Sequence, residues 1–372
     1  MERLSIAARP DKAEKLESIG LSFHGWDDYW KEDAAYKFSA EQVDVLEEAT
    51  QQLNDMCLQA VKHVIDNDRL GDLGIPQAYW QAVRDSWNRS DMTLYGRFDF
   101  AYTGTGVPKL LEYNADTPTS LLESAVAQWY WMEEVYPYAD QFNSLHEKLV
   151  NQWKRLPASV TTIHFASVSE NEEDWVCCHY LMETAVQAGY EVKHIYVEDL
   201  GYQESTQSFV DLDNVPIQAL FKLYPWEWMM REEFGKKIAA SKTKFIEPMW
   251  KSVLSNKAML AILWELFPGN KYLLPAFFDA NGMTNYAKKP FFSREGANVE
   301  LYSEGQQIAA DEGPYGSEGH VYQALTELPE FDGKYAVIGS WVVGNEPAGM
   351  CIREDSLKIT TNMSNFVPHF FI

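Results

Sequence analysis

Cysteine and basic residues are scarce in this sequence, and each shortage excludes a class of protein. Four of the 372 residues are cysteine, which is too few for a disulfide scaffold, and no pair has the CxxC spacing of a zinc or redox site. Lys and Arg total 31 against 55 Asp and Glu, so the net charge is −24. A nucleic-acid partner is therefore not expected, because phosphates are neutralised by clustered Lys and Arg. The acidic surplus fits a cationic partner such as a polyamine, or it serves solubility alone.

Long hydrophobic runs, sorting signals and common catalytic motifs are also missing. The longest apolar runs, such as residues 258–264, reach about seven residues, whereas a membrane helix needs about 20. Residues 1–15 contain no apolar core of a signal peptide. The sequence has no HExxH, GxSxG, GxGxxG or P-loop pattern. We therefore expect a cytoplasmic protein with no membrane partner, no zinc hydrolase centre and no nucleophilic Ser or Cys.

The hydrophobic pattern predicts a mixed α and β fold with a parallel-sheet portion. Ser39 and Gln42 have the spacing of a capping box, and apolar residues then recur at helical spacing to about Asn67. Residues 161–168 and 191–200 have strand-like patterns on either side of a helical stretch. This order is typical of a β-α-β unit, in which the loop after the first strand lies at the ligand-binding edge of a parallel sheet.

The rest of the chain predicts further helices and antiparallel pairs. Ser120 and Glu123 have capping-box spacing at the start of a helix predicted to reach about residue 135. Another helix is predicted over residues 251–267. Residues 344–345 are a Gly-Asn pair between two apolar strands, which indicates a two-residue hairpin turn.

Four polar residues on a predicted hairpin form the first candidate site. Arg97 and Asp99 lie two residues apart on one strand, and Glu112 and Asn114 lie two apart on the next. If the strands pair across the GTGVP turn, all four side chains share one face. Two carboxylates and an amide oxygen suit Mg²⁺, and the guanidinium suits a phosphoryl group. The alternative is a solvated hairpin face with a surface ion pair.

Two further groups of charged residues are candidates for ligand contacts. Lys257, Lys289 and the Gly296 loop that follows suit nucleotide phosphates, although most lysines are solvated surface residues. Glu172 and Glu173, with Asp174 beside them, begin the predicted helix of the β-α-β unit. They either stabilise the helix dipole or hold the ammonium group of a substrate.

Six stretches of the sequence resemble the glutathionylspermidine synthase family, in its stand-alone synthetase or acid–amine ligase form, over nearly the whole chain. The resemblance implies an α/β ATP-grasp fold with a pre-ATP-grasp parallel-sheet portion. It also implies one synthetase unit over 1–372, with approximate lobes at 1–155 (metal-site hairpin and helices), 156–230 (the β-α-β portion) and 231–372 (the nucleotide-binding region). The stretches are YGRFDFAYTGTGVPKLLEYNADTPTSLLE, EPMWKSVLSNK, KKPFFSREGANV, VYQALTELP, VIGSWVV and GMCIRED.

The resemblance implies a reaction and a set of site residues. The reaction would join a carboxylate, such as that of a glutathione-like peptide, to an amine, such as a spermidine-like polyamine, with ATP and Mg²⁺ through an acyl phosphate. Arg97 would be the catalytic residue that stabilises the transferring phosphoryl group and the tetrahedral intermediate, and residues 293–298 would close over the site. The other implied roles are magnesium binding by Asp99, Glu112 and Asn114, ATP binding by Lys257, Lys289, Gly296 and Gln323, and substrate binding by Thr117, Thr119, Glu172, Glu173 and Arg353.

Two other functions and several details stay open at this stage. A carbohydrate-active hydrolase is suggested by the abundant Trp and paired carboxylates, and would act without nucleotide. A non-catalytic polyamine or peptide binder on the ligase scaffold would bind without turnover. Amidase activity is not expected, because the synthetase-like pattern begins near residue 1, whereas the bifunctional relatives carry an amidase domain before it. The acid, the amine and the oligomeric state are not determined by the sequence.

Overall fold

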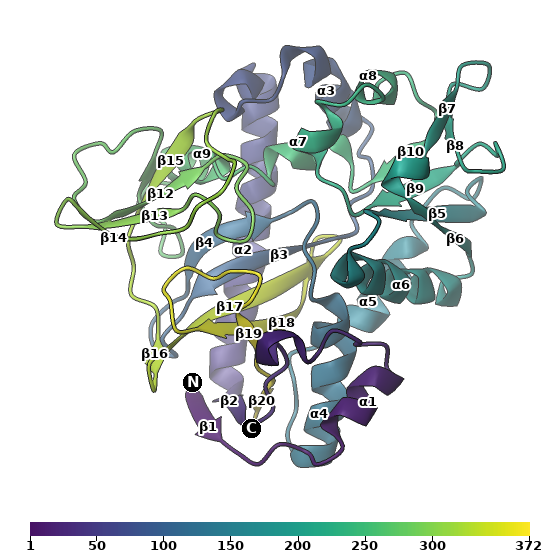
Figure 1. Cartoon of the computed structure of the whole chain (residues 1–372). Coiled ribbons are helices and arrows are strands. Elements are labelled where there is room, and N and C mark those ends of the chain that lie inside the picture. The colour runs from purple at the N-terminus through teal and green to yellow at the C-terminus, as the bar shows by residue number, and fades with distance from the viewer.

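A six-stranded sheet lies at the centre of the fold and combines strands from both ends of the sequence (Figure 1). The computed structural model describes residues 1–372 apart from the side chain of Asp27. The sheet consists of β3 (Tyr95–Ala101), β4 (Lys109–Asn114), β16 (Glu330–Phe331), β17 (Lys334–Val343), β18 (Glu346–Asp355) and β19 (Asn365–Phe366). Its order is β19-β18-β17-β3-β4 with β16 paired to β17, so a hairpin of the first third pairs with one of the last third. The predicted two-residue turn is confirmed, since Val343 pairs with Glu346.

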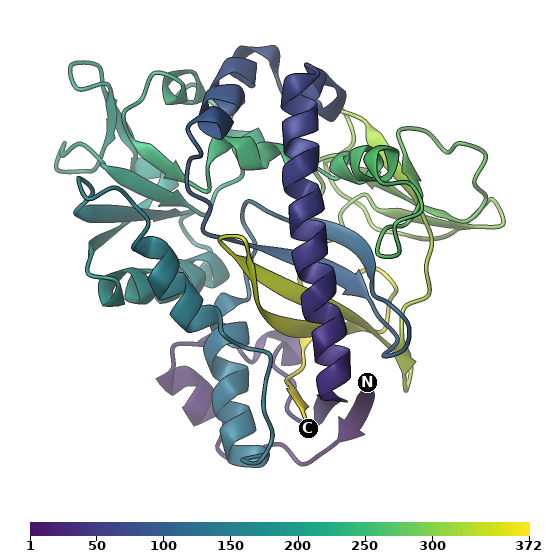
Figure 2. The same ribbon diagram turned by 180° about the vertical axis from the view of Figure 1, so that it is seen from behind.

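The long helix α2 (Ala40–Asp66) crosses the back of this sheet (Figure 2). Ser39 Oγ accepts a hydrogen bond from the Gln42 N–H, and Gln42 Oε1 accepts one from the Ser39 N–H, which confirms the predicted capping box. Thr50 Oγ1 meets Ser340 Oγ of β17 at 2.6 Å. The helix thus covers the sheet face that carries Phe98. The opposite face, which carries Arg97 and Asp99, is left open to a cavity.

A parallel sheet flanks the central one and contains the predicted β-α-β unit. Its order is β10-β9-β5-β6, and every pair is parallel. Helix α6 packs on β5 and β6, and α5 packs on α6. The chain after β5 therefore emerges at the carboxyl edge of the sheet and faces the central hairpins (Figure 1). The bounds are α5 Leu145–Trp153, β5 Thr162–Ser167, α6 Glu172–Gln187, β6 Glu191–Tyr196, β9 Ala219–Lys222 and β10 Lys244–Ile246.

An antiparallel sheet lies on the other side of the central one. Its order is β11-β15-β12-β13-β14, and helix α9 packs against β11, β15 and α2. The central sheet is therefore placed between a parallel and an antiparallel layer (Figure 1). The bounds are α9 Met259–Leu266, β11 Ala276–Phe277, β12 Tyr286–Pro290, β13 Glu300–Ser303, β14 Gln306–Ala310 and β15 His320–Ala324.

The two chain ends meet in a small sheet of order β1-β2-β20, where the N- and C-termini lie close together (Figures 1 and 2). The remaining strands and α-helices are β1 Glu2–Ser5, α1 Lys12–Ser18, β2 Ala34–Phe38, α3 Trp80–Asn88, α4 Gln128–Val135, β7 Gly201–Gln203, β8 Ser208–Val210, α7 Trp226–Met229, α8 Gly235–Ile238 and β20 His369–Phe371. Short 3-10 helices occupy Trp26–Asp28, Arg69–Leu73, Gln77–Tyr79, Val197–Asp199 and Met249–Val253, and a π-helical turn occupies Glu123–Ala127.

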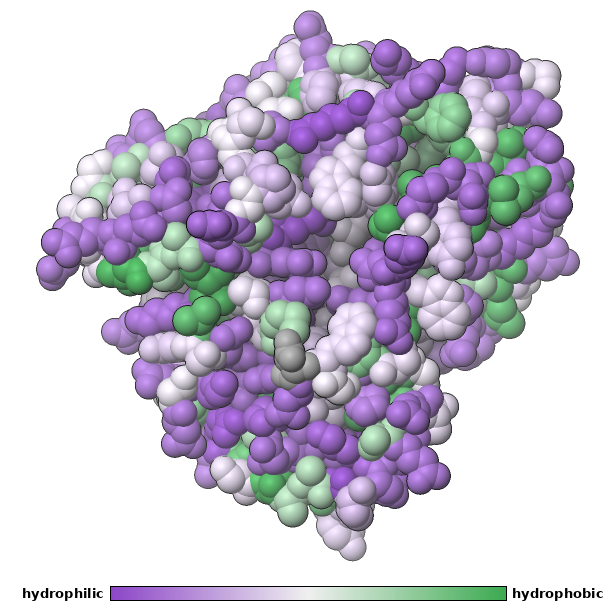
Figure 3. All heavy atoms as spheres, in the orientation of Figure 1, coloured by the Kyte–Doolittle hydropathy of each residue, from purple (hydrophilic) through white to green (hydrophobic). Residues whose placement is uncertain are grey.

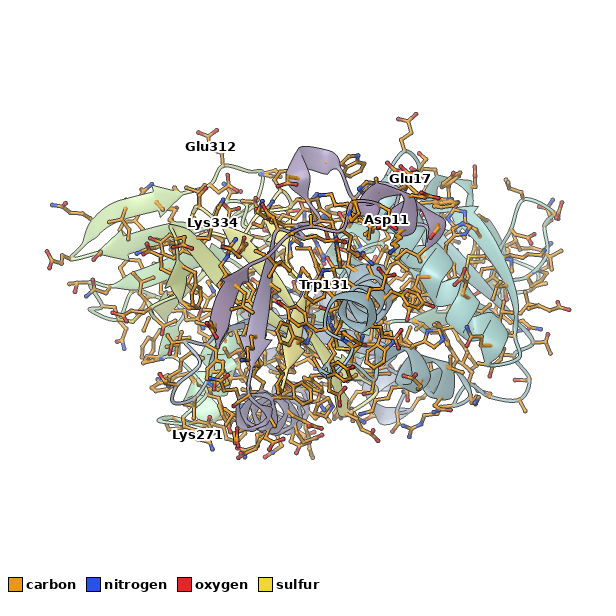
Figure 4. All side chains as sticks on the ribbon, turned by 90° about the horizontal axis from the view of Figure 1, so that it is seen from below. Asp11, Glu17, Trp131, Lys271, Glu312 and Lys334 are labelled. Carbon is orange, nitrogen blue, oxygen red and sulfur yellow. The ribbon has the colours of Figure 1, made fainter. Side chains whose placement is uncertain are left out.

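Aromatic side chains fill the interior on both faces of the central sheet. Trp131 is fully buried, and Figure 4 labels it near the centre of the view, whereas Glu312 and Lys271 lie at its upper and lower edges. All four cysteines are buried and free, so they pack as small hydrophobic residues. Within the described residues, no helix is long and apolar enough to cross a membrane.

Two sequence predictions about helices are wrong. The helix predicted over 251–267 is interrupted: a 3-10 helix ends at Val253 and α9 begins only at Met259. Between them the side chain of Asn256 accepts a hydrogen bond from the Ala258 N–H, which is the local bond of a turn. The predicted capping box of Ser120 does not form. Ser120 has a φ of 71°, and the Glu123 carboxylate accepts a hydrogen bond from Tyr29 Oη instead. The helical segment nevertheless ends at Val135, as predicted.

Candidate active site

The hairpin β3–β4 brings the four predicted polar residues to one face. Arg97 pairs with Asn114 and Asp99 pairs with Glu112 across the antiparallel register. On the other side of β3, Asp99 pairs with Gly339 of β17. A Cβ at Gly339 would lie 2.7 Å from Arg97 Cδ, so the glycine leaves the space in which the guanidinium lies. The structure thus places all four side chains around one point above the sheet.

The polar groups on this face form a continuous hydrogen-bonded chain. Arg97 Nε donates to Asp99 Oδ1 at 2.8 Å. Asn114 Nδ2 donates to Asp99 Oδ2 at 3.0 Å and to Glu112 Oε1 at 3.3 Å. Lys257 Nζ lies 3.0 Å from Glu112 Oε2. A lysine from the last third of the sequence therefore completes the group that the hairpin begins.

The electrostatics of the group are set by burial and by this pairing. Burial by itself would raise the pKa of Glu112, but the charges of Lys257, Lys289 and Arg97 lower that pKa to about 2. Burial raises the pKa of Asp99 above its ordinary value, and the nearby Glu112 adds to the rise against the opposing effect of Arg97. The two carboxylates thus lie close enough to repel each other, and a further cation between them would relieve that repulsion.

The donor set fits a magnesium ion. Two carboxylates and one amide are the kind of protein ligands that Mg²⁺ takes while keeping positions for water and phosphate oxygens. Asn114 presents its nitrogen to both carboxylates, so its amide has to turn over to offer Oδ1 to a cation. The described side chains hold no cluster of three or more His, Cys, Asp or Glu suited to a metal. The fit is therefore to an ion that arrives with phosphate.

Two cavities meet at this group. The polar cavity, about 240 Å³, lies between the hairpin, the loop after β5 and the loop around Arg294. The apolar cavity, about 160 Å³, lies between the hairpin and the β12–β15 sheet. Figure 3 shows hydrophilic side chains around a hollow near the centre of the face that is turned to the viewer. The residues that line both cavities are Asp99, Glu112, Gly296, Val337 and Thr360.

The apolar cavity ends in two polar residues from neighbouring strands. Lys289 Nζ donates to Gln323 Oε1 at 2.7 Å and to the Leu111 carbonyl at 2.9 Å. Gln323 Nε2 donates to the Leu110 carbonyl at 2.9 Å. Burial lowers the pKa of Lys289 to about 8, although Glu112 opposes this shift. The other walls are mainly aliphatic, including Ala287, Val299, Leu301, Leu325 and Ile359.

The loop at residues 293–298 closes over the junction of the two cavities. Gly296 has a φ of 76°, and a Cβ there would lie 2.7 Å from Ile359 Cγ2 and 2.8 Å from the Thr360 oxygen. Lys257 Nζ donates to the Ser293 carbonyl at 2.5 Å. The loop therefore contacts both Lys257, which is predicted to bind the nucleotide, and the segment at residues 359–360.

The predicted substrate residues from three other segments line the polar cavity. Thr117 Oγ1 accepts a hydrogen bond from Arg294 Nη1 at 2.6 Å, and the Thr119 carbonyl accepts one from Arg97 Nη1 at 3.1 Å. Arg353 also lines this cavity, and its Nε donates to the Ser364 carbonyl at 3.0 Å. These residues converge although they come from separate parts of the chain.

The acidic residues at the start of α6 differ in their relation to the polar cavity. Glu172 is exposed and does not line the cavity, whereas Glu173 and Asp174 do. Burial and the repulsion of Glu173 raise the pKa of Asp174 to about 7. Arg294 and Glu295 also line this cavity, although neither residue was given a role of its own from the sequence. The only sequence signal for these two residues was their nearness to Gly296.

Arg294 is positioned by a contact that no local pattern predicts. Its Nη2 donates to Glu227 Oε1 of α7 at 2.7 Å, across 67 residues of sequence. Glu227 itself is buried. The guanidinium therefore bridges α7 and Thr117, and it fixes the loop at residue 294 against the floor of the polar cavity.

Comparison with known proteins gives one family over the whole chain. A family model described as glutathionylspermidine synthase preATP-grasp matches residues 3–372, which confirms the resemblance and the α/β fold class predicted from the sequence. A Haemophilus influenzae protein named "Putative acid–amine ligase" is 41% identical over 100% of both chains. Trypanothione synthetase of Crithidia fasciculata is 31% identical over 83% of this chain and 52% of its own length. The bifunctional glutathionylspermidine synthetase/amidase of Escherichia coli is 30% identical over 89% and 58%. The chain thus spans little more than half of these last two proteins.

Proposed function

Because the chain belongs to the glutathionylspermidine synthase preATP-grasp family, we propose that it joins a substrate carboxylate to an amine with ATP and Mg²⁺ through an acyl phosphate. It is an acid–amine ligase that forms an amide bond, as its relatives are named ligases or synthetases. The proposal concerns the cofactors, the intermediate and the residues that act. The acid we propose is a glutathione-like peptide, and the amine is a spermidine-like polyamine.

The observation that carries the proposal is the shared wall of the two cavities. A ligase of this kind needs a nucleotide and an acid on opposite sides of one transferring phosphoryl group. Asp99, Glu112 and Gly296 line both cavities, and Arg97 lies on the polar side only. This arrangement supports a phosphoryl group at the junction, with the nucleotide in the apolar cavity and the two other substrates in the polar one.

The apolar cavity suits the base of ATP. Aliphatic side chains such as Leu301 and Ile359 offer two faces for a planar ring, and Gln323 offers hydrogen-bonding groups at its edge. Lys289 lines this cavity, and Lys257 Nζ lies 3.0 Å from Glu112 Oε2 in the shared wall, so both lysines suit the phosphates as point charges. Gly296 lets the backbone of the closing loop approach the same place.

Asp99, Glu112 and, after its amide turns over, Asn114 would hold the magnesium ion. When bound there, Mg²⁺ neutralises charge on the phosphate oxygens of ATP. Arg97 is held by Asp99 and by the Thr119 carbonyl, so its guanidinium is fixed before a substrate arrives. It stabilises negative charge as that charge develops on the phosphoryl oxygens and later on the tetrahedral carbon.

The proposed chemistry takes place in two substitutions. A carboxylate oxygen of the acid attacks the γ-phosphorus, the bond to the β,γ-bridging oxygen breaks, and ADP leaves. The unprotonated amine nitrogen then attacks the acyl carbon, inorganic phosphate leaves, and the nitrogen loses a proton to give the amide. The loop at residues 293–298 excludes water, which would otherwise hydrolyse the acyl phosphate.

The polar cavity has regions suited to the two substrates. Glu173, Asp174 and Glu295 give one part a negative charge that suits an amine. Arg353 and Arg294 give another part a positive charge that suits the carboxylates of a peptide acid. This division supports a polyamine and an acidic peptide as the substrate classes.

ADP release measured across acid and amine pairs tests the proposal. Glutathione with spermidine is the first pair, and each assay is run with and without Mg²⁺. We expect sustained ADP release only when the acid, Mg²⁺ and a nitrogen nucleophile are all present. When the amine is replaced by hydroxylamine, the nucleophile traps the acyl phosphate, and ADP and a hydroxamate should form together. Equal ADP release without Mg²⁺, or amide formation without ADP, would contradict the mechanism.

A further inference from the structure

A third cavity, which we call the rear cavity, lies outside the two cavities of the proposed active site. Its volume is about 840 Å³, against about 240 Å³ for the polar cavity, and the two share no lining residue. Its walls are α3, the turn at residues 155–157 and the segment 238–249, which includes β10 (Figure 1). Cavities of about 300–1,000 Å³ are typical of small-molecule sites.

Two buried donors in the wall of the rear cavity lack partners. The hydroxyl of Ser86 and the indole N–H of Trp226 have no hydrogen-bond partner among the described residues. Ser86 is 2% exposed and Trp226 is 0% exposed, and both line the cavity. Buried polar groups are normally paired, because an unpaired donor loses its hydration without compensation. Two such donors in one cavity indicate an occupant with acceptor atoms.

The rim of the rear cavity is basic, in contrast to the rest of the protein. Lys242, Lys244 and Arg155 line the cavity, are exposed and form no ion pair within the described part of the chain. Arg89 also lines it and is paired with Asp91 at 2.7 Å. The only other acidic lining residue is Asp85. A basic cluster on a chain of net charge −24 selects an anion over a cation.

The inner wall of the rear cavity is apolar. Ile238, Met249 and Leu156 are buried and line it together with Phe245. An inorganic anion would leave this surface without a contact, whereas an anion with a ring would cover it. The occupant therefore needs an apolar body as well as a negative charge.

We propose that the rear cavity is a binding site for a small organic anion with a planar apolar body. Its carboxylate, phosphate or sulfonate group lies near Arg155, Lys242 and Lys244. Its ring lies against the apolar wall, and an acceptor atom meets the Ser86 hydroxyl or the indole N–H of Trp226. This site is independent of the acid, the amine and the nucleotide of the proposed reaction.

The rear cavity lies directly behind a wall of the proposed active site. The backbone N–H of Trp226 donates to Asp116 Oδ2 at 2.9 Å, and Asp116 Oδ1 accepts from Lys222 Nζ at 2.5 Å. The preceding residue, Pro225, lines the polar cavity. An occupant that contacts the Trp226 ring therefore touches the helix α7 whose other residues position Arg294.

The test uses anilinonaphthalene sulfonate, an anionic aromatic fluorophore, with the full-length protein. We expect one molecule to bind per chain with a rise in fluorescence. Ala239 lines the rear cavity and its neighbour Ala240 does not, and both are exposed. Ala239→Trp fills the mouth and is expected to weaken binding about tenfold, and Ala240→Trp should leave the affinity within about twofold of the original.

A charge reversal supplies a second, independent measurement. Arg155→Glu is expected to weaken binding about fivefold, and the adjacent Lys154→Glu, which makes the same charge change outside the cavity, is expected to change it less than twofold. The proposal is overturned if the probe does not bind the original protein at one site. It is equally overturned if the two tryptophan variants, or the two glutamate variants, bind alike. ADP release plays no part in this test, so its outcome is separate from that of the proposed reaction.

Discussion

The polar and apolar cavities meet at one wall but are built in different ways. The apolar cavity is formed mainly by strands, with Ala287 and Lys289 on β12, Leu301 on β13 and Gln323 on β15. The polar cavity is formed largely by loops at residues 117–119, 168–171, 294–296 and 360–362 and by the first turn of α6. Strands paired in a sheet hold side chains more firmly than loops do. The comparison indicates that the apolar cavity is suited to one fixed ligand, the nucleotide. Specificity for the acid and the amine is set in the polar cavity.

The polar groups of the two cavities are also held differently. Lys289 and Gln323 bond each other and the backbone of β4. Arg353 bonds carbonyls of the loop at 361–364, and Arg294 bonds Thr117. A substitution in the apolar cavity should therefore change the kinetic constants for ATP alone. A substitution in the polar cavity should change those for the acid or the amine, and one in the shared wall should change those for all three substrates.

The largest effect is expected for Asp99→Asn in the shared wall. Loss of the charge removes a proposed magnesium ligand and the partner of Arg97, so kcat for ADP release should fall about a hundredfold or more. Asp213→Asn, at an exposed position outside both cavities, is the control and should keep its rate. A near-native kcat for Asp99→Asn would remove the magnesium assignment.

Gly296→Ala tests whether the closing loop belongs to the shared wall. Gly296 and Gly282 have φ values of 76° and 74°, so Ala costs similar backbone strain at both. Only at Gly296 would the Cβ meet other atoms, namely Ile359 Cγ2 and the Thr360 oxygen. We expect kcat/KM for all three substrates to fall about tenfold for Gly296→Ala. Gly282→Ala should lose stability only, so an equal kinetic loss in both variants would contradict this role.

The sequence predicts the part of the site that depends on local geometry. Arg97, Asp99, Glu112 and Asn114 come together because a short turn fixes the register of one hairpin, and side chains alternate along its strands. The β-α-β unit and the capping box of α2 follow from equally local rules. The local sequence pattern alone is therefore sufficient to predict that these four polar side chains share one face of the hairpin.

Contacts between distant segments could not be predicted from local pattern. Lys257 reaches Glu112 across 145 positions of sequence, and only the family resemblance placed it there. The contact of Arg294 with Glu227 depends on the packing of α7, which no periodicity specifies. The sequence could not tell which of the adjacent Glu172, Glu173 and Asp174 line the cavity, because the rotation of α6 about its axis is set by its packing on β5 and β6.

A substitution confined to the apolar cavity should act on ATP alone. Lys289→Met removes a charge near the phosphates, so the KM for ATP should rise about tenfold while the KM values for acid and amine stay within about twofold. Lys288→Met is the matched control, since Lys288 is the next residue and pairs with Glu300 outside the cavity. Equal rises in all three KM values for Lys289→Met would show that the two cavities are not separate.

The same lysine gives the apolar cavity a pH dependence. Burial lowers the pKa of Lys289 to about 8, so the free enzyme holds this charge below pH 8 and loses it above. Because phosphates favour the protonated amine, the affinity for ATP is full below pH 8 and should fall as the pH rises. Measured between pH 7 and 9.5, the KM for ATP should rise in the original protein and stay level in Lys289→Met. A parallel rise in the variant would assign the effect to another group.

The smallest effect is expected on the polar side, at the start of α6. Asp174→Asn and Glu173→Gln each remove one charge from the region proposed for the amine, so the KM for the amine should rise about fivefold with the KM for ATP unchanged. Glu172→Gln removes the same charge one position away, outside the cavity, and should change the KM less than twofold. A similar rise in all three variants would mean that long-range attraction by the acidic surface, and not a site, draws in the amine.

The pH dependence of the KM for the amine distinguishes a direct contact with Asp174 from long-range attraction by the acidic surface. The pKa of Asp174 is raised to about 7 by burial and by Glu173, so this carboxyl is neutral below pH 7 and charged above. A cationic amine favours the charged form, and its KM should therefore fall as the pH rises from 6 to 8. Asp174→Asn should abolish that part of the dependence and Glu172→Gln should retain it, because only Asp174 lies in the polar cavity. If Asp174→Asn retained the full pH dependence of the KM for the amine, the amine would bind away from Asp174. The proposed division of substrates between the two cavities would then be contradicted.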